Sequence, residues 1–196
     1  MPTSDGHDPV NRRGFFRGVT ARLLGAVADQ IEHRLPKSDT REYLHLRPPG
    51  AIGEDRFASV CQRCGECVKV CPANAIVPLP ETMGALAGTP VVVADRAPCV
   101  VCEGLKCTHV CPSGALLPLM LAHEIQMGIA EVYADRCVRS SGESCTLCVD
   151  RCPMGAAAIR FVGAGPPEVL SPGCVGCGVC QFYCPTSPKA IIVRAV

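Results

Sequence analysis

The sequence predicts an irregular, loop-rich α+β fold built from four repeats, each combining a cysteine loop, a short helix and a short strand. Its 196 residues include 16 Cys, 18 Pro and 19 Gly, but no Trp and only 4 % aromatic residues. With so few large rings, the core needs something other than side chains at its centre. The cysteines form four sets of four, whose first members stand 38, 38 and 37 residues apart. This spacing marks an internal repeat.

Every cysteine belongs to a set, and each set ends in Cys-Pro. Sets one and four have the spacing C-x2-C-x2-C-x3-C-P, whereas set two widens the second gap to four residues and set three widens the first gap to seven. The unexpanded spacing is that of bacterial ferredoxin-type [4Fe–4S] ligation. We therefore predict four [4Fe–4S] clusters, bound by these metal ligands in chain order: Cys61, Cys64, Cys67, Cys71, Cys99, Cys102, Cys107, Cys111, Cys137, Cys145, Cys148, Cys152, Cys174, Cys177, Cys180 and Cys184.

The close spacing of these thiolates suits an iron cluster. Thiolates are soft ligands that bind iron, and cysteines two residues apart let one short loop surround the cluster. Gly65, Gly176 and Gly178 give those loops the backbone freedom that they need. The proline after each fourth cysteine fixes φ, so that the chain turns away from the loop. In two-cluster ferredoxins this fourth cysteine ligates the neighbouring cluster.

Two repeats make one ferredoxin-like unit, so four repeats predict two such units packed around the clusters. Sets one and four share the unexpanded spacing, and sets two and three share an expanded one. We therefore predict that set one pairs with set four, and set two with set three. In that arrangement Cys71 serves the cluster of set four and Cys184 the cluster of set one. Sequential pairing, of one with two and of three with four, is the alternative.

Zinc and disulfides are the other chemistries open to these cysteines. Zinc sites usually combine one C-x2-C with a second pair some distance away. Disulfide scaffolds are usually shorter, secreted chains without such a repeat. A triple run followed by Cys-Pro, repeated four times, favours iron–sulfur clusters over both.

Short elements are predicted after the cysteine loops. Small and apolar residues following two of the Cys-Pro pairs predict strands at Ala158–Val162 and Ala190–Val193. Pro118–Ile129 is predicted to be a short helix that places Leu119, His123 and Met127 on one side, as core packing or as cover for a cluster. The repeats, near residues 61–72, 99–112, 137–153 and 174–185, thus define one domain over residues 47–196.

Residues 1–46 are predicted to form a separate N-terminal arm. Asn11-Arg12-Arg13-Gly14-Phe15-Phe16-Arg17 is similar to a twin-arginine export motif, but charges interrupt the apolar run that a signal needs. A retained amphipathic helix is favoured, with export as the alternative. Its apolar side recurs every four residues, at Phe15, Val19, Leu23, Val27, Ile31 and Leu35.

Bulk composition excludes several classes of function. The net charge of +1 gives no electrostatic reason to expect a nucleic-acid partner. No run of 18 apolar residues is present, so the chain is expected to be peripheral to a membrane at most. His109, inside set two, is predicted to be a partly exposed side chain, because a complete cysteine set needs no fifth ligand. Without a nucleotide-binding glycine motif, a nucleophile–base pair or a spare cysteine, the chain is predicted to have no catalytic residues and to be an electron carrier or electron-transfer subunit rather than an enzyme.

From Arg47 to the C-terminus the chain resembles the NapG and MauM type of ferredoxin-type proteins, which are associated with nitrate reductase and methylamine dehydrogenase operons. The resemblance is carried by Arg47-Pro48-Pro49-Gly50-Ala51-Ile52 before set one, Gly88-Thr89-Pro90, Pro112-Ser113-Gly114-Ala115-Leu116 after set two, Met127-Gly128 before set three and the seven-residue gap within set three.

This resemblance implies a four-cluster electron relay. Its expected partners are a membrane-bound quinol-oxidising iron–sulfur protein and a terminal reductase or dehydrogenase. The alternative function is an accessory factor in the maturation or assembly of a partner redox enzyme. The weak export motif favours a cytoplasmic or cytoplasmic membrane-associated location, with periplasmic export by the twin-arginine route as the alternative.

Overall fold

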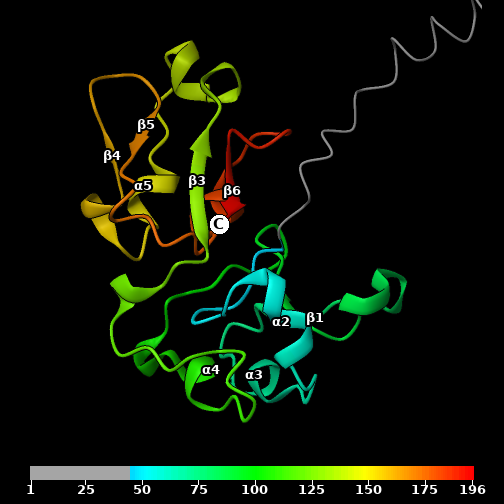
Figure 1. The fold of residues 1–196 in the computed structure, drawn as a ribbon. Helices are drawn as coiled ribbons and strands as arrows, with labels where there is room; N and C mark the ends of the chain where they lie inside the picture. The colour runs from blue at the N-terminus through cyan, green and yellow to red at the C-terminus, as the bar shows by residue number, and fades with distance from the viewer. Residues whose placement is uncertain (1–44) are drawn as a thin grey trace, which may run out of the picture. The chain divides into compact units, whose positions relative to one another are not determined.

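Short helices and two-stranded sheets alternate along residues 45–196, the part of the chain that the computed structural model describes (Figure 1). The predicted twin-arginine-like motif and amphipathic helix lie outside the described residues. The helices are α2 (Glu54–Val60), α3 (Glu66–Lys69), α4 (Lys106–His109), α5 (Leu147–Asp150) and α6 (Val179–Tyr183). The strands are β1 (Ile76–Pro78), β2 (Pro90–Val92), β3 (Gly128–Val132), β4 (Ile159–Phe161), β5 (Pro167–Val169) and β6 (Ile191–Ala195). Within residues 45–196, no helix has the length and apolar character to cross a membrane.

Strand pairing follows the same order in two stretches of the chain, residues 51–116 (the first half) and 128–195 (the second half). In the second half β3 pairs antiparallel with β6, and β4 pairs antiparallel with β5 between them in sequence. In the first half β1 pairs antiparallel with β2, and an antiparallel bridge joins Ala51 to Leu116 outside them. In each half, therefore, the first and last segments pair antiparallel with each other, and so do the two strands between them.

A one-turn helix carries the third cysteine of every set: Cys67 in α3, Cys107 in α4, Cys148 in α5 and Cys180 in α6. Three of the four helices begin directly after a residue in the left-handed region, namely Gly65, Leu105 or Gly178. All four end before a Cys-Pro pair, because proline provides no N–H to continue the helical hydrogen bonds. The mixed helix and strand, loop-rich character predicted from the sequence is confirmed.

Both predicted strands are confirmed to within two residues, as β4 and β6, but the predicted helix over Pro118–Ile129 is wrong. Residues Ala122–Glu124 form only a 3-10 turn, in which the Glu124 carboxylate accepts backbone N–H bonds from Met120 and Leu121. The backbone N–H of Met127 donates instead to the Val175 carbonyl, and β3 then begins at residue 128. Pairing with β6 therefore overrides the local helical periodicity. Met127 is buried as predicted and His123 is exposed.

The hydrophobic core consists of aliphatic side chains interleaved with cysteines. One cluster lies mainly in the first half, around the fully buried Phe57 of α2, and includes Cys67, Cys107 and Cys177. A second cluster in the second half combines Ile159 and Ile191 with cysteines of sets three and four. Phe57 is the only buried aromatic side chain of the described residues, so aliphatic side chains and cysteines form most of the core.

A buried arginine joins the segment before α2 to that helix and to strand β2. The Arg47 guanidinium forms a two-point ion pair with Glu54, with Nε 2.7 Å from one carboxylate oxygen. Its Nη1 donates to the Thr89 hydroxyl and to the Pro90 carbonyl, each at 2.9 Å. The same group lies 4.4 Å above the centre of the Phe57 ring. A planar fork with five donors suits this combination, which lysine cannot reproduce.

Replacing Arg47 by methionine is expected to destabilise the protein by about 3 kcal/mol, because it leaves the Glu54 carboxylate partly buried without its partner. For a chain of this length that corresponds to a fall of about 6–12 °C in apparent Tm, measured by circular dichroism at a fixed scan rate. Arg160→Met is the matched control, since Arg160 pairs with Glu168 at the surface and both are about half exposed. Equal effects of the two substitutions would contradict this account of Arg47.

Candidate metal centres

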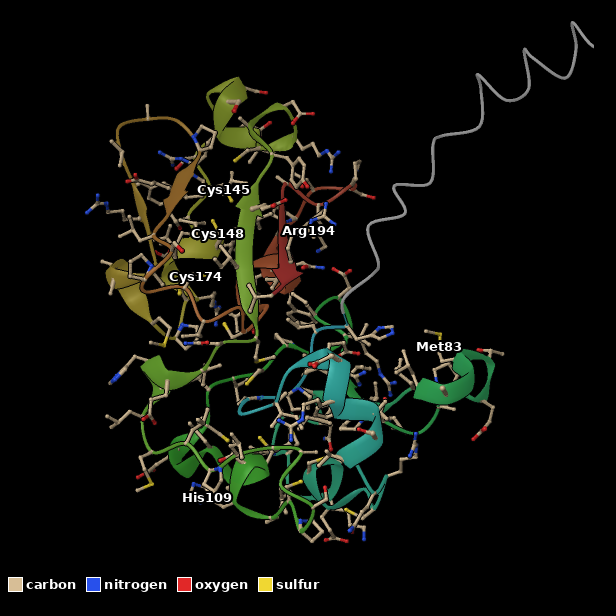
Figure 2. The ribbon with its side chains drawn as sticks, viewed as in Figure 1. Met83, His109, Cys145, Cys148, Cys174 and Arg194 are labelled. Atoms are coloured by element: carbon tan, nitrogen blue, oxygen red, sulfur yellow. The ribbon has the colours of Figure 1, made fainter. Side chains whose placement is uncertain are left out.

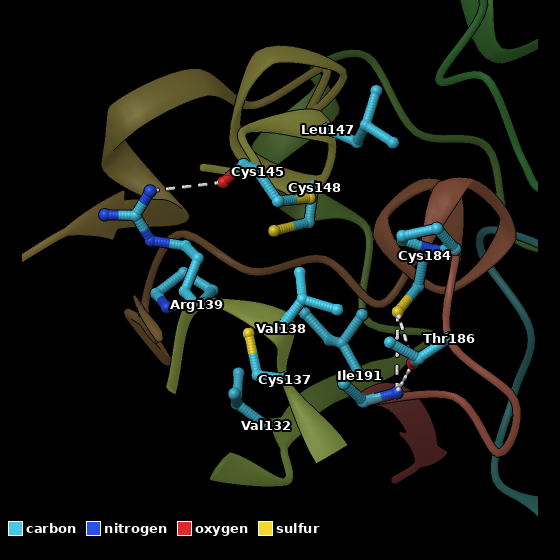
Figure 3. A pocket seen from close by; sticks show the side chains of 13 residues that line it. Val132, Cys137, Val138, Arg139, Cys145, Leu147, Cys148, Cys184, Thr186 and Ile191 are labelled. Atoms are coloured by element: carbon cyan, nitrogen blue, oxygen red, sulfur yellow. Dashed lines mark hydrogen bonds between the residues drawn. The ribbon is translucent and has the colours of Figure 1, made fainter. Parts of the chain in front are cut away.

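The sixteen cysteines are all free of disulfide bonds and lie within the described residues. Twelve of them line three cavities, and each cavity is lined by the first three cysteines of one set and one cysteine from another. Site A comprises Cys61, Cys64, Cys67 and Cys111. Site C comprises Cys137, Cys145, Cys148 and Cys184 (Figure 3). Site D comprises Cys174, Cys177, Cys180 and Cys152.

The remaining cysteines, Cys71, Cys99, Cys102 and Cys107, form site B. Burial raises the pKa of Cys99 to about 11, with smaller contributions from the charges of Cys102 and Cys71. Burial likewise raises the pKa of Cys107 to about 12, followed by the charges of Cys99, Cys102 and Cys71. Site B thus repeats the arrangement of the other three, with three cysteines from set two and one from set one.

The structure overturns the predicted pairing of set one with set four and of set two with set three. The fourth cysteines are exchanged between consecutive sets: Cys71 and Cys111 between sets one and two, and Cys152 and Cys184 between sets three and four. Strand pairing is the physical reason, because each half joins its own first and last segments and so brings consecutive loops together. Two sets with similar gap lengths therefore do not lie next to each other. The cysteines group as in the sequential alternative, which pairs set one with set two and set three with set four.

The third cysteine lies among the other three cysteines of its site, and it is buried in sets one, two and four and partly buried, as Cys148, in set three. Burial is the largest cause that raises its pKa, and the charges of those three cysteines raise it further, to about 11 for Cys67, about 12 for Cys107 and about 11 for Cys148, with the same direction for Cys180. Four neighbouring thiols in such surroundings do not ionise together in neutral solution. A bound metal removes this penalty, because it deprotonates a coordinating thiol outright.

Two of the exchanged cysteines behave differently. Burial acts to raise the pKa of Cys111 and of Cys184, but hydrogen bonds from nearby N–H and hydroxyl groups outweigh it, so that both pKa values are lowered. The Leu116 N–H lies 3.4 Å from the Cys111 sulfur, and the Ala190 N–H lies 3.4 Å from the Cys184 sulfur (Figure 3). These donors favour a thiolate at each position.

Left-handed backbone turns shape three of the cysteine loops. In sets one, two and four the residue just before the second cysteine has positive φ: Arg63 at 54°, Val101 at 50° and Gly176 at 71°. At Val101 this conformation is a genuine outlier, because a β-branched side chain crowds the backbone there. The sequence predicted this freedom only where glycine provides it, so Arg63 and Val101 carried no recognisable signal.

Two arginines, each two residues after the first cysteine of its set, hold the loops that follow. Arg63 donates from Nε to the Ala87 carbonyl at 2.8 Å and from Nη2 to the Ala85 carbonyl at 2.8 Å, between β1 and β2. Arg139 donates from Nε to the Gly165 carbonyl at 2.7 Å, between β4 and β5, and lies above the Phe161 ring. Sequence reasoning missed both residues, although their equal offset from the first cysteine was a visible signal.

The other features weighed from the sequence are peripheral to the cysteines. His109 lies at the end of α4 (Figure 2), is exposed and has its Nε2 3.0 Å from the Leu119 carbonyl oxygen, as expected of a residue that is not a ligand. Within residues 45–196, no three His, Cys, Asp or Glu side chains converge as they would around a single metal ion. The cysteines of sites A, C and D instead surround cavities.

Comparison with known proteins agrees with this donor set. Residues 60–115 match the family of 4Fe-4S dicluster domains (Fer4_7). Over 93 % of its length the chain is 37 % identical to the ferredoxin-type protein NapG of Escherichia coli, of which it covers 84 %. It is 35 % identical over 93 % of its length to the methylamine utilization ferredoxin-type protein MauM of Methylobacillus flagellatus, covering 82 %, and 36 % identical over 94 % to MauM of Methylorubrum extorquens, covering 89 %. The chain therefore belongs to the NapG and MauM family of ferredoxin-type iron–sulfur proteins.

Glycine at position 176 is expected to be indispensable, because a Cβ there overlaps the backbone of Gly128 at the start of β3. Gly65 has a similar φ of 76° but no atom within 4 Å of such a Cβ. Gly65→Ala should therefore cost only the left-handed strain, about 1–2 kcal/mol. Gly176→Ala should cost at least about 3 kcal/mol, since the overlap adds to that strain. Thermal unfolding of the two variants, followed by circular dichroism, measures the difference, and similar losses would refute the close contact.

Proposed function

We propose that this protein is an electron relay that holds four [4Fe–4S] clusters, one in each of sites A, B, C and D. The observation that carries this proposal is the grouping of all sixteen cysteines into four sets of three plus one exchanged. Each cluster needs four thiolates, and each site contains four. The cluster supplies one-electron redox chemistry, while the protein sets its potential and position.

The exchange of fourth cysteines supports a description of the chain as two ferredoxin-like units. Residues 51–116 contain sites A and B, and residues 128–195 contain sites C and D. In each half the outer segments pair, the inner strands pair and the two cysteine loops exchange one ligand. These features follow the four repeats that the sequence predicts, and they agree with the exchange known from two-cluster ferredoxins.

Contacts between the halves give the four sites a linear order. The Cys99 N–H of site B donates to the Cys177 carbonyl of site D at 2.9 Å. The charge of Cys99 also contributes, after burial, to raising the pKa of Cys177. Sites A and B exchange cysteines, as do C and D, so the order along the protein is A–B–D–C. Sites A and C stand at the two ends, where electrons enter and leave.

Family membership directs the proposal toward particular partners. The relatives are named for ferredoxin-type roles, and two of those described are named for methylamine utilization. We propose that the chain passes single electrons between a membrane-bound quinol-oxidising protein and a terminal reductase or dehydrogenase, and is not itself an enzyme. It works on the cytoplasmic side of the membrane, and twin-arginine export to the periplasm is the alternative.

A role in the maturation or assembly of a partner enzyme is the second candidate, and it rests on the resemblance to the MauM type alone. Deleting the protein separates the two roles. Loss of a relay leaves a partner enzyme with its full complement of cofactors but without electrons from quinol. Loss of a maturation factor leaves a partner that lacks a cofactor and stays inactive with an artificial electron donor.

Anaerobic analysis of the purified protein is expected to find about 16 iron and about 16 sulfide per chain, four of each for every cluster. Reduction with dithionite should produce overlapping EPR signals from S = 1/2 clusters, broadened by coupling between neighbours. A protein that holds zinc and little sulfide would refute the electron-transfer proposal.

The exchange of cysteines is tested by pairs of Cys→Ser substitutions. Cys111→Ser should remove one cluster, or about four iron atoms. Adding Cys64→Ser should cause no further loss, because both residues belong to site A. Adding Cys102→Ser instead should remove about eight iron atoms in total, since Cys102 belongs to site B. The opposite result would contradict the exchange. If Cys111→Ser with Cys102→Ser removed only about four iron atoms, and Cys111→Ser with Cys64→Ser removed about eight, each set would bind its own cluster.

A further inference from the structure

Hydroxyl groups distinguish two of the four exchanged cysteines. Thr186, two residues after Cys184, places its Oγ1 3.2 Å from the Cys184 sulfur (Figure 3). Ser113 occupies the same position after Cys111, with its Oγ 3.6 Å from that sulfur. Sulfur accepts hydrogen bonds at longer distances than oxygen because its atomic radius is larger. Both hydroxyls belong to half-buried residues, so part of the surrounding water is excluded.

The direction of these hydrogen bonds follows from the chemistry of the groups. A cysteine that binds iron is a thiolate and has no proton to give. At Thr186 the hydroxyl oxygen already accepts the Ala190 N–H at 2.9 Å, which leaves its own proton free for sulfur. The hydroxyl is therefore the donor and the ligand sulfur the acceptor.

The other two exchanged cysteines have no such partner. The residue two positions after Cys71 is Ala73, and the residue two positions after Cys152 is Met154. Backbone donors do not make the same distinction, because Cys71 accepts the Ala75 N–H at 3.4 Å, much as Cys111 and Cys184 accept theirs. The hydroxyl is thus the feature that separates the fourth ligands of sites A and C from those of sites B and D.

We propose that the hydroxyls of Ser113 and Thr186 raise the reduction potentials of sites A and C above those of sites B and D. The inference rests on the proposed function, in which these sites hold clusters. Reduction adds negative charge that is shared with the ligand sulfurs, and a hydrogen bond to sulfur stabilises that charge. In the order A–B–D–C, electrons then reside at the two ends, and the inner pair carries them across.

A neighbouring charge acts in the same direction at one end. Lys189 donates from Nζ to the Cys184 carbonyl at 2.6 Å, which brings a positive charge close to site C. A comparison of whole sites would combine its effect with that of the hydroxyl. The test therefore changes the hydroxyl alone and keeps every charge.

The experiment is an anaerobic redox titration of the complete protein, followed by EPR. Thr186→Val and Ser113→Ala should each lower the reduction potential of one cluster, by about 59 mV for a tenfold change in a one-electron equilibrium. The shift should be larger for Thr186→Val, because its oxygen lies closer to sulfur, at 3.2 Å against 3.6 Å. Thr186→Ser and Ser113→Thr keep the hydroxyl and should titrate as the unaltered protein does.

A gain-of-hydroxyl variant covers the case in which a loss variant folds poorly. Ala73 is half-buried beside an open groove, so a serine oxygen has space there. Ala73→Ser should raise the potential of one cluster, at site B. Variants with full iron and sulfide but unmoved potentials would overturn this inference and leave the relay intact. An unaltered protein without clusters would overturn the relay, and the inference with it.

Discussion

Exchange of the fourth cysteine between consecutive loops is the constraint on which the rest of the structure depends. A loop that gives its last ligand to its neighbour cannot complete its own site alone. Cys111 therefore has to return to site A, and Cys184 to site C, which requires the chain after each second loop to lie beside the segment before the first. Backbone hydrogen bonds meet this requirement in both halves. In the first half Ala51 forms a bridge with Leu116, and in the second half β3 pairs with β6. A two-stranded sheet needs further packing to be stable, and here strand residues such as Ile76 and Ile191 pack in clusters that contain cysteines.

The same constraint explains how a chain with few aromatic residues forms a core. Buried thiols with raised pKa values gain nothing from being close to one another unless a metal deprotonates them. Where a site of this kind binds its metal, the free energy of binding is also free energy of folding, as in other small domains held together by metal. Arg47 contributes the complementary element, a conventional buried ion pair that fixes α2 against β2 independently of any cysteine. Two kinds of interaction thus stabilise this part of the chain: the cysteine sites A and B, and the buried ion pair of Arg47 with Glu54.

The sequence predicted the cysteine sets, the loop-rich α+β character and two of the strands, because these depend on spacing and on local periodicity. The pairing of sets was predicted wrongly, since gap length reports the shape of one loop and carries no information on which loop lies next to it. The helix predicted over Pro118–Ile129 failed for a related reason: the partners of that segment, Val175 and β6, are distant in sequence. The left-handed backbone at Arg63 and Val101 was missed because nothing in either residue type indicates that conformation.

The junction between the halves supports the proposed order A–B–D–C through contacts close to the backbone. Cys99 forms a main-chain hydrogen bond with Cys177, and the loop residue Gly178 lies against Ala94 with no space for a side chain of its own. Neither contact depends on a flexible side chain, so the two together hold the second and fourth loops at a constant separation. In the proposed relay, electron transfer between sites B and D depends on this constant separation, because no cysteine is exchanged between those two sites. Within each half the exchange of cysteines sets the separation of the sites, and between the halves the contact of Gly178 with Ala94 and one main-chain hydrogen bond have the same effect.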